Sequence, residues 1–140
     1  MAETWVLNAS PTIVLAKIGR LDLLAGPERI LLLPEAVALE ISAGPEGDAA
    51  RTAIARGEIP DRRTVTVPAD VVEWSLGSGE SAVIALARLL AATAVLDDFE
   101  ARACARSLGV RVIGTLGVVL RARREGRPGG AEGRGRRGVD

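Results

Sequence analysis

Short apolar runs alternate with segments that carry helix signals along most of this 140-residue chain, and this alternation constrains the fold more than any other feature. The runs at residues 5–8, 30–33, 64–67, 93–96 and 110–113 predict strands; the segments 11–18, 21–24, 34–41, 48–56, 79–91, 99–108 and 116–124 predict helices. The run at 30–33 is apolar throughout, which is typical of a strand buried on both faces of a parallel sheet. The order of these segments therefore predicts an α/β domain with a largely parallel sheet.

The composition changes near the C-terminus. Residues 1–120 hold 11 basic and 15 acidic side chains, whereas residues 121–140 hold 7 arginines and 3 acids. Residues 125–140 are rich in Gly and Arg and have almost nothing apolar to bury, so we expect a disordered tail behind one domain of residues 1–124. No signal peptide is evident, and the longest weakly polar stretch, 81–96, is too short to span a bilayer. We therefore expect a cytoplasmic protein that does not enter the membrane.

Composition also excludes several chemistries. The chain has no His, a single Cys and only three aromatic residues, Trp5, Trp74 and Phe99. A His-activated nucleophile, a disulfide and a Cys/His zinc site are therefore ruled out. Three scattered aromatic residues also make a poor platform for stacking nucleobases. Carboxylates remain as the groups for chemistry near neutral pH, and they would act with a divalent metal.

The predicted sheet nominates candidate site residues. Ligands of parallel α/β sheets bind beyond the carboxyl ends of the strands, near the point where the strand order reverses. Asn8 follows the first predicted strand, and Asp97 and Asp98 follow the fourth. The sequence contains neither Gly-x-Gly-x-x-Gly in the first strand-to-helix turn nor Gly-Lys-Ser/Thr anywhere, so the nucleotide fingerprints are absent. We interpret the Gly-Ser-Gly segment at 77–79 as a flexible entry to a helix.

Five fragments, taken in order, resemble the PIN-domain family over roughly residues 4–124. They are Val6-Leu7-Asn8-Ala9-Ser10-Pro11, then Leu33-Pro34-Glu35-Ala36-Val37 with Glu40 in the same helix, then Gly79-Glu80, Leu96-Asp97-Asp98 and Gly114-Thr115-Leu116-Gly117. Within the family, the chain is similar to a prokaryotic PIN-like branch related to the VapC-type ribonuclease toxins of toxin–antitoxin pairs. The resemblance implies a PIN-like, Rossmann-like three-layer domain with a central, mostly parallel sheet.

The resemblance also implies a metal-dependent endoribonuclease that uses Mg²⁺ or Mn²⁺. It places metal ligands on five residues, of which the four acids are also catalytic: Asn8, Glu40, Glu80, Asp97 and Asp98. It makes Ser10 and Thr115 substrate-binding residues. Hard divalent cations take oxygen ligands, and a metal-bound water is a better nucleophile, so converging acids suit this chemistry. The implied partners are RNA, an antitoxin-like protein and a second copy of the chain.

Each of these positions also has a purely structural interpretation. Asp97 and Glu100 fit a capping box, and Glu80 lies in a first helical turn, where an acid favours the helix dipole. Asn8, at a strand end, would commonly be a turn residue. Glu40 lies on the apolar stripe of its helix, so we expect its carboxylate to face inward and to need a positive partner or a metal.

Asn8 departs from the family pattern, because an amide brings a neutral oxygen where a carboxylate would bring a full charge. This departure keeps open a second function, a non-catalytic PIN-like module that binds RNA or protein without cleaving. The zero net charge of the chain also supports this alternative, since it does not help to bind a polyanion. In the metal-free protein, we expect Glu40, Glu80 and at least one of Asp97 and Asp98 to form one acidic pocket, whose repulsion raises a carboxylate pKa.

Overall fold

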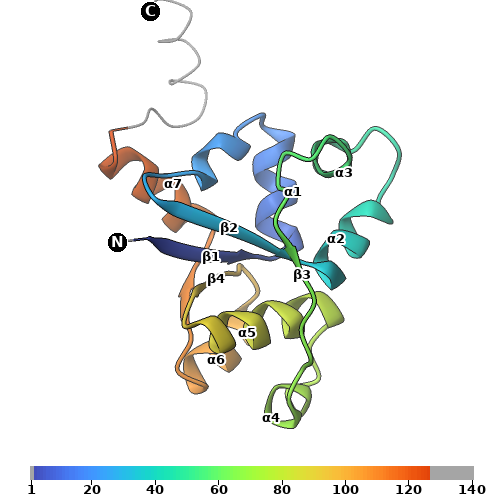
Figure 1. The fold of residues 1–140 in the computed structure, drawn as a ribbon, viewed down its shortest axis with the longest axis vertical. Coiled ribbons are helices and arrows are strands. Elements are labelled where there is room, and N and C mark those ends of the chain that lie inside the picture. The colour runs from blue at the N-terminus through green and yellow to red at the C-terminus, as the bar shows by residue number, and fades with distance from the viewer. Residues whose placement is uncertain (1, 127–140) are drawn as a thin grey trace, which may run out of the picture.

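The computed structural model describes residues 2–126, which form a five-stranded sheet between two layers of helices (Figure 1). The strands are β1 (Glu3–Leu7), β2 (Arg29–Pro34), β3 (Arg62–Arg63), β4 (Thr93–Val95) and β5 (Arg111–Ile113). Their order across the sheet is β3-β2-β1-β4-β5, and every neighbouring pair is parallel. The predicted α/β class and parallel sheet are confirmed.

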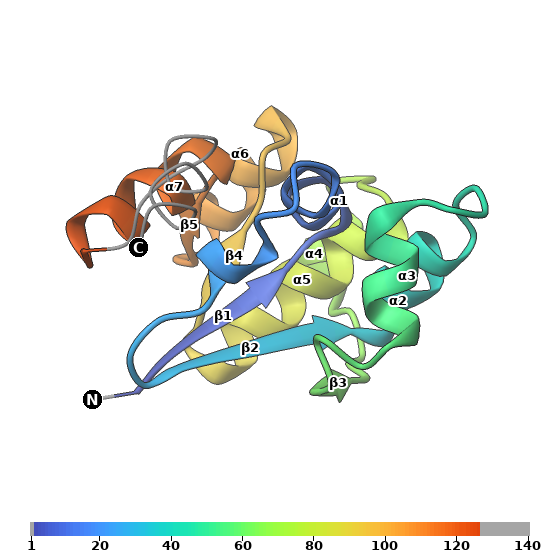
Figure 2. The same cartoon turned by 90° about the horizontal axis from the view of Figure 1, so that it is seen from above.

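Helices cover both faces of this sheet. They are α1 (Ala9–Lys17), α2 (Glu35–Ser42), α3 (Ala49–Ala55), α4 (Ala69–Val72), α5 (Ser78–Leu90), α6 (Phe99–Ser107) and α7 (Thr115–Arg124), with a 3-10 turn, η1 (Leu21–Leu24). Helices α1, α3 and α7 lie over one face and α5 and α6 over the other (Figure 1, Figure 2). Helix α2 contacts α1 and α3 as well as α5, so it joins the two helical layers. This packing buries both faces of the central strands, as the apolar runs predicted.

The strand order reverses at β1, because β2 lies on one side of it and β4 on the other. In the register, Leu7 of β1 pairs with Val95 of β4, and the next residue, Asn8, donates its backbone N–H to the Val95 carbonyl at 3.2 Å. Residues 8 and 97–98 therefore leave the sheet side by side. This is the edge at which ligands of such sheets bind, and we refer to it as the carboxyl edge.

One predicted strand is wrong. Residues 64–67 form no strand, and β3 consists of Arg62 and Arg63 alone. These two residues pair with Leu33 and Pro34, at the very end of β2, after which the chain turns into α2. Residues beyond 63 therefore have no strand to pair with, and their partly buried valines pack on the core instead. The short helix α4 was not predicted.

The last element that the structure describes is helix α7. Helix α7 ends at Arg124 with Glu125 as its C-cap. The predicted tail lies outside the described residues from position 127 onward. Within residues 2–126, no helix is both long enough and apolar enough to cross a membrane.

Candidate functional site

Asn8 holds a buried side-chain oxygen that has no hydrogen-bond partner within residues 2–126. The residue follows β1, acts as the N-cap of α1 without a side-chain capping bond, and is only 4% exposed. Its backbone is satisfied, since Thr12 Oγ1 donates to the Asn8 carbonyl at 2.8 Å. Its side-chain Oδ1, however, is buried with no hydrogen-bond partner among the described residues. Leaving such a group unpaired costs about 1–3 kcal/mol, so a turn role alone does not account for it.

Gly79 brings the Glu40 carboxylate close to this oxygen. A Cβ atom at position 79 would lie 2.5 Å from Glu40 Oε1 and 3.7 Å from Asn8 Oδ1. One oxygen from α2 and one from the end of β1 therefore lie near the Cα atom of Gly79, in the first turn of α5. A residue with a Cβ atom would fill the space that Glu40 Oε1 occupies. The interpretation of residues 77–79 as a flexible entry missed this role. A glycine inside the first turn of a predicted helix, where it weakens the helix, is the only hint that the sequence gives.

The expectation that Glu40 faces inward is wrong, because the residue is exposed. The buried side of α2 is formed by Val37, Ala38 and Ile41. Glu40 lies beside that stripe, and its carboxylate extends over the start of α5 rather than into the core. An exposed carboxylate needs no buried positive partner, and it remains accessible to a ligand.

Glu80 is the carboxylate with the most perturbed environment at this edge. Burial raises its pKa above the ordinary value, and the negative charges of Asp98 and, more weakly, Glu40 raise it further. A hydrogen bond from the Gly77 backbone acts in the opposite direction. The predicted rise of a carboxylate pKa is therefore present, although burial contributes more than repulsion. The same charges show that Glu80, Asp98 and Glu40 share one electrostatic neighbourhood.

Asp97 and Asp98 have different surroundings. Asp97 Oδ1 accepts the Thr115 backbone N–H at 2.7 Å, and Asp97 Oδ2 accepts the Thr115 hydroxyl at 2.5 Å, so both of its oxygens are engaged. Asp98 is the N-cap of α6 and accepts the Ala101 backbone N–H through Oδ2 at 2.9 Å. The capping-box interpretation therefore chose the wrong residue of the pair. Through its hydrogen bonds from Thr115, Asp97 joins the start of α7 to the end of β4. The negative charge of Asp98 instead raises the pKa of Glu80.

The carboxyl edge thus brings together Asn8, Glu40, Glu80 and Asp98, while Asp97 is occupied by Thr115. Ser10 lies in the first turn of α1 and is exposed. Among residues 2–126, no three or more His, Cys, Asp or Glu side chains are grouped closely enough to hold a metal ion by themselves. The available donors nevertheless suit a hard cation, since they are amide and carboxylate oxygens, one of them buried and unpartnered beside a glycine.

Comparison with known proteins identifies the family. The family DUF3368, described as a PIN domain, matches residues 4–132. This chain therefore belongs to the PIN-domain family, as the five fragments implied. No match was found among curated proteins.

Solved structures share the fold at low identity. PAE2754 from Pyrobaculum aerophilum is 16% identical with a TM-score of 0.55, covering 89% of this chain and 99% of that one. VapBC2 from Rickettsia felis, solved bound to a DNA fragment from their promoter, is 10% identical with a TM-score of 0.50, covering 79% of this chain and 98% of that one. At these identities the likeness establishes the fold alone, a PIN-like α/β domain with a parallel sheet.

Proposed function

We propose that this protein is a metal-dependent endoribonuclease of PIN type, which hydrolyses phosphodiester bonds in RNA. The observation that carries the proposal is the approach of Asn8 Oδ1, buried and unpartnered, and Glu40 Oε1 to the same point above Gly79. A bound cation would give that oxygen the partner it lacks. Membership of the PIN-domain family supports the class of reaction.

Asn8, Glu40, Glu80 and Asp98 are the residues that would hold Mg²⁺ or Mn²⁺, which supplies a more acidic bound water and offsets charge on the phosphate. Burial and the charge of Asp98 raise the pKa of Glu80, and a bound cation would favour its ionised form. Asp97 would act by positioning, since it holds Thr115 and the start of α7 at the carboxyl edge. Ser10 and Thr115 stay predicted substrate contacts.

We also propose that the protein is cytoplasmic and that it is the toxin of a toxin–antitoxin pair, with an antitoxin-like protein and a second copy of itself as partners. The structural likeness to VapBC2 supports this context. A second candidate function is the non-catalytic PIN-like module. The amide at Asn8 favours it, as does the lack of a ready three-acid group within residues 2–126.

A cleavage assay separates the two functions. The full chain is incubated with a generic single-stranded RNA in Mg²⁺ or Mn²⁺, with and without a chelator. We expect cleavage that the chelator abolishes and that Glu40→Gln or Glu80→Gln lowers about a hundredfold or more. The matched control is Glu46→Gln, which removes an exposed acid from the loop after α2. If the chain binds the RNA but cleaves it with neither metal, the module is the correct function.

A further inference from the structure

Basic side chains gather at the end of the molecule opposite the carboxyl edge. Helices that connect parallel strands run back along the sheet, so their last turns lie at the amino ends of the strands. Those last turns carry basic residues in four helices: Lys17 in α1, Arg88 in α5, Arg106 in α6, and Arg121, Arg123 and Arg124 in α7. Arg111 adds a further charge at the first residue of β5. We refer to this end as the amino edge.

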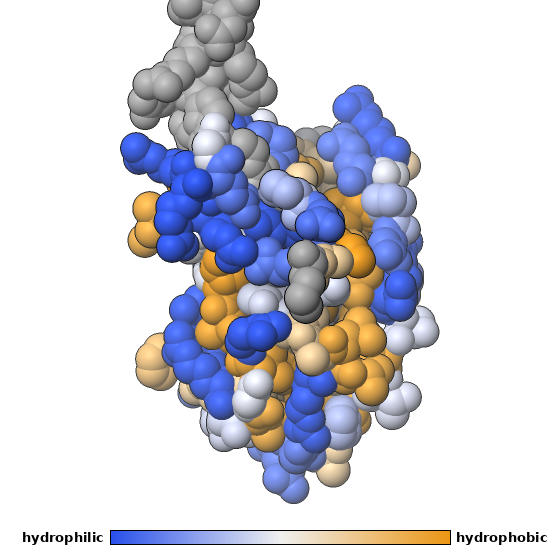
Figure 3. Space-filling model, turned by 60° about the vertical axis from the view of Figure 1, so that its left-hand side comes forward, coloured by the Kyte–Doolittle hydropathy of each residue, from blue (hydrophilic) through white to orange (hydrophobic). Residues whose placement is uncertain are grey.

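Several of these arginines pair with no acid in the part of the chain that the structure describes. Arg88 is paired with Asp70, and Arg121 is paired with Glu3. Arg106, Arg111, Arg123 and Arg124 are exposed, and no carboxylate of the described residues makes an ion pair with any of them. In Figure 3, hydrophilic residues gather over the end of α7 and continue below it as patches between apolar ones. The amino edge therefore exposes more positive charge to solvent than is required to balance the helix dipoles.

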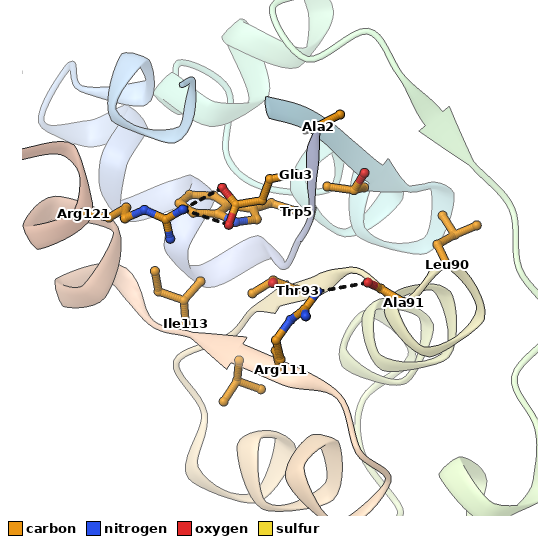
Figure 4. A pocket seen from close by; sticks show the side chains of 11 residues that line it. Ala2, Glu3, Trp5, Leu90, Ala91, Thr93, Arg111, Ile113 and Arg121 are labelled. Carbon is orange, nitrogen blue, oxygen red and sulfur yellow. Dashed lines mark hydrogen bonds and ion pairs between the residues drawn. The ribbon is translucent and has the colours of Figure 1, made fainter. Parts of the chain in front are cut away.

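A cavity of about 540 Å³ opens at the same edge. Trp5 lies at its back, Leu90 and Ile113 form apolar walls, and Arg111 and Arg121 project from two sides (Figure 4). Because Glu3 neutralises Arg121, Arg111 supplies the unbalanced charge; its Nη2 donates to the Ala91 carbonyl at 3.1 Å, which holds the guanidinium at the rim. The volume is within the range of small-ligand sites, and the lining suits an anion that carries an apolar, planar group.

We infer that the amino edge binds the phosphate backbone of a nucleic-acid strand, with Arg106 and Arg111 on phosphates and one nucleotide in the cavity. The inference rests on the proposed function for the identity of the strand as RNA. The carboxyl edge is acidic and repels a polyanion, so a nuclease of this kind needs its affinity from another surface.

The test measures RNA binding by the full chain in a chelator, so that no cleavage is required. The double variant Arg106→Gln/Arg111→Gln is compared with the wild type on a single-stranded RNA of about 20 nucleotides over a range of salt. We expect affinity to fall roughly three- to tenfold at low salt and the slope of log affinity against log salt to become shallower by about 1.4, or 0.7 per lost phosphate contact. The matched control, Arg56→Gln/Arg63→Gln, removes two exposed arginines elsewhere and should leave the slope unchanged.

Three outcomes overturn the inference: an unchanged slope in the double variant, an equal loss in the control, or an unchanged RNA affinity together with lost binding of a poly-glutamate peptide. The last of these would make the amino edge a docking face for an acidic protein. Failure of the proposed function has a different signature. A chain that binds RNA through Arg106 and Arg111 but never cleaves it leaves this inference standing and contradicts the nuclease. If the chain cleaves RNA with metal, but the slope of log affinity against log salt is the same in the double variant and the wild type, only the inference is contradicted.

Discussion

Charged and polar side chains are paired at one end of the sheet and lack such partners among the described residues at the other. At the amino edge, the Arg29 side chain is 1% exposed and is bonded to Glu3 at 3.2 Å and to Glu125 at 2.5 Å. It also donates to two backbone carbonyls and lies over the Trp5 ring at 3.8 Å from the centroid. At the carboxyl edge, the Asn8 oxygen has no partner among the described residues, and Glu80 lies within reach of the negative charges of Asp98 and Glu40.

The pKa values follow the same division. Burial acts to raise the pKa of Glu3, but its hydrogen bonds to Arg121 and Arg29 outweigh it, so that pKa is lowered. At Glu80 burial and like charge act together, so its pKa is raised. An ionised Glu3 therefore stabilises the fold, whereas an ionised Glu80 opposes it. Ion pairs at the amino edge thus stabilise the structure, whereas the carboxyl edge holds an amide oxygen without a partner among the described residues and a carboxylate whose pKa is raised.

The largest expected effect comes from breaking the amino-edge ion pairs. Replacing Arg29 with Ala leaves Glu3 and Glu125 paired with Arg121 but without the buried guanidinium that also joins them, and it removes the packing on Trp5. We expect a loss of about 3 kcal/mol in the free energy of unfolding, measured by urea denaturation at neutral pH. The control is Arg63→Ala, which breaks an exposed pair with Asp61 and should cost less than about 0.5 kcal/mol. Equal losses in the two variants would show that the buried ion pairs of Arg29 contribute no more to the free energy of unfolding than an exposed pair does.

The second largest effect is expected from replacing the amide of Asn8 at the carboxyl edge. Asn8→Asp keeps the shape of the side chain but adds a charge to a buried position near Glu40. Without metal, we expect a loss of about 2 kcal/mol in stability. With Mg²⁺ or Mn²⁺, binding should tighten roughly tenfold to a hundredfold by calorimetry, and the metal-induced rise in Tm should grow. If neither metal affinity nor cleavage rate changes, Asn8 is a turn residue and the binding module becomes the better proposal.

Much of the fold was predictable because burial on both faces leaves a local signature. The strands that contact β1 are runs of apolar residues, and each was placed within a few positions of its observed bounds. β3 was not predictable in this way, because its two residues are exposed arginines and its position depends on where β2 ends. The alternating segment 64–67 satisfies the local rule for a strand but has no neighbour to pair with.

The candidate site was likewise predictable only in part. The positions of residues after the predicted strands were enough to nominate Asn8 and the Asp97–Asp98 pair, whereas Glu40 and Glu80 were nominated by the resemblance to the PIN-domain family. Neither kind of evidence could assign separate roles to Asp97 and Asp98, because the partner of Asp97 is Thr115, 18 positions later. The role of Gly79 was missed for a similar reason, since it depends on how α2 and α5 cross. Tertiary contacts, which the sequence specifies only collectively, decide such roles.

A smaller effect is expected from filling the space above Gly79. In Gly79→Ala, the new methyl group displaces the exposed Glu40 carboxylate, while alanine favours the helix. We expect stability without metal to stay within about 1 kcal/mol of the wild type, and the metal-induced rise in Tm to be largely lost. The control is Gly77→Ala, where the nearest atom, Glu80 Oε1, lies at an ordinary 3.7 Å. An undiminished metal response in Gly79→Ala would show that Glu40 and Asn8 do not act together.

The smallest effect concerns Glu80 and depends on pH. Because its folded-state pKa is raised, ionised Glu80 destabilises the native protein above that pKa and has no effect below its unfolded value. Without metal, Glu80→Gln should therefore be slightly more stable than the wild type at pH 7, by less than the change expected for Asn8→Asp. This advantage should shrink as the pH falls through the raised pKa and vanish near pH 4, about the unfolded value. Urea denaturation of both proteins across this range measures the difference, with Glu46→Gln as the flat control. A constant difference at all pH values would show that Glu80 contributes through packing rather than through its charge.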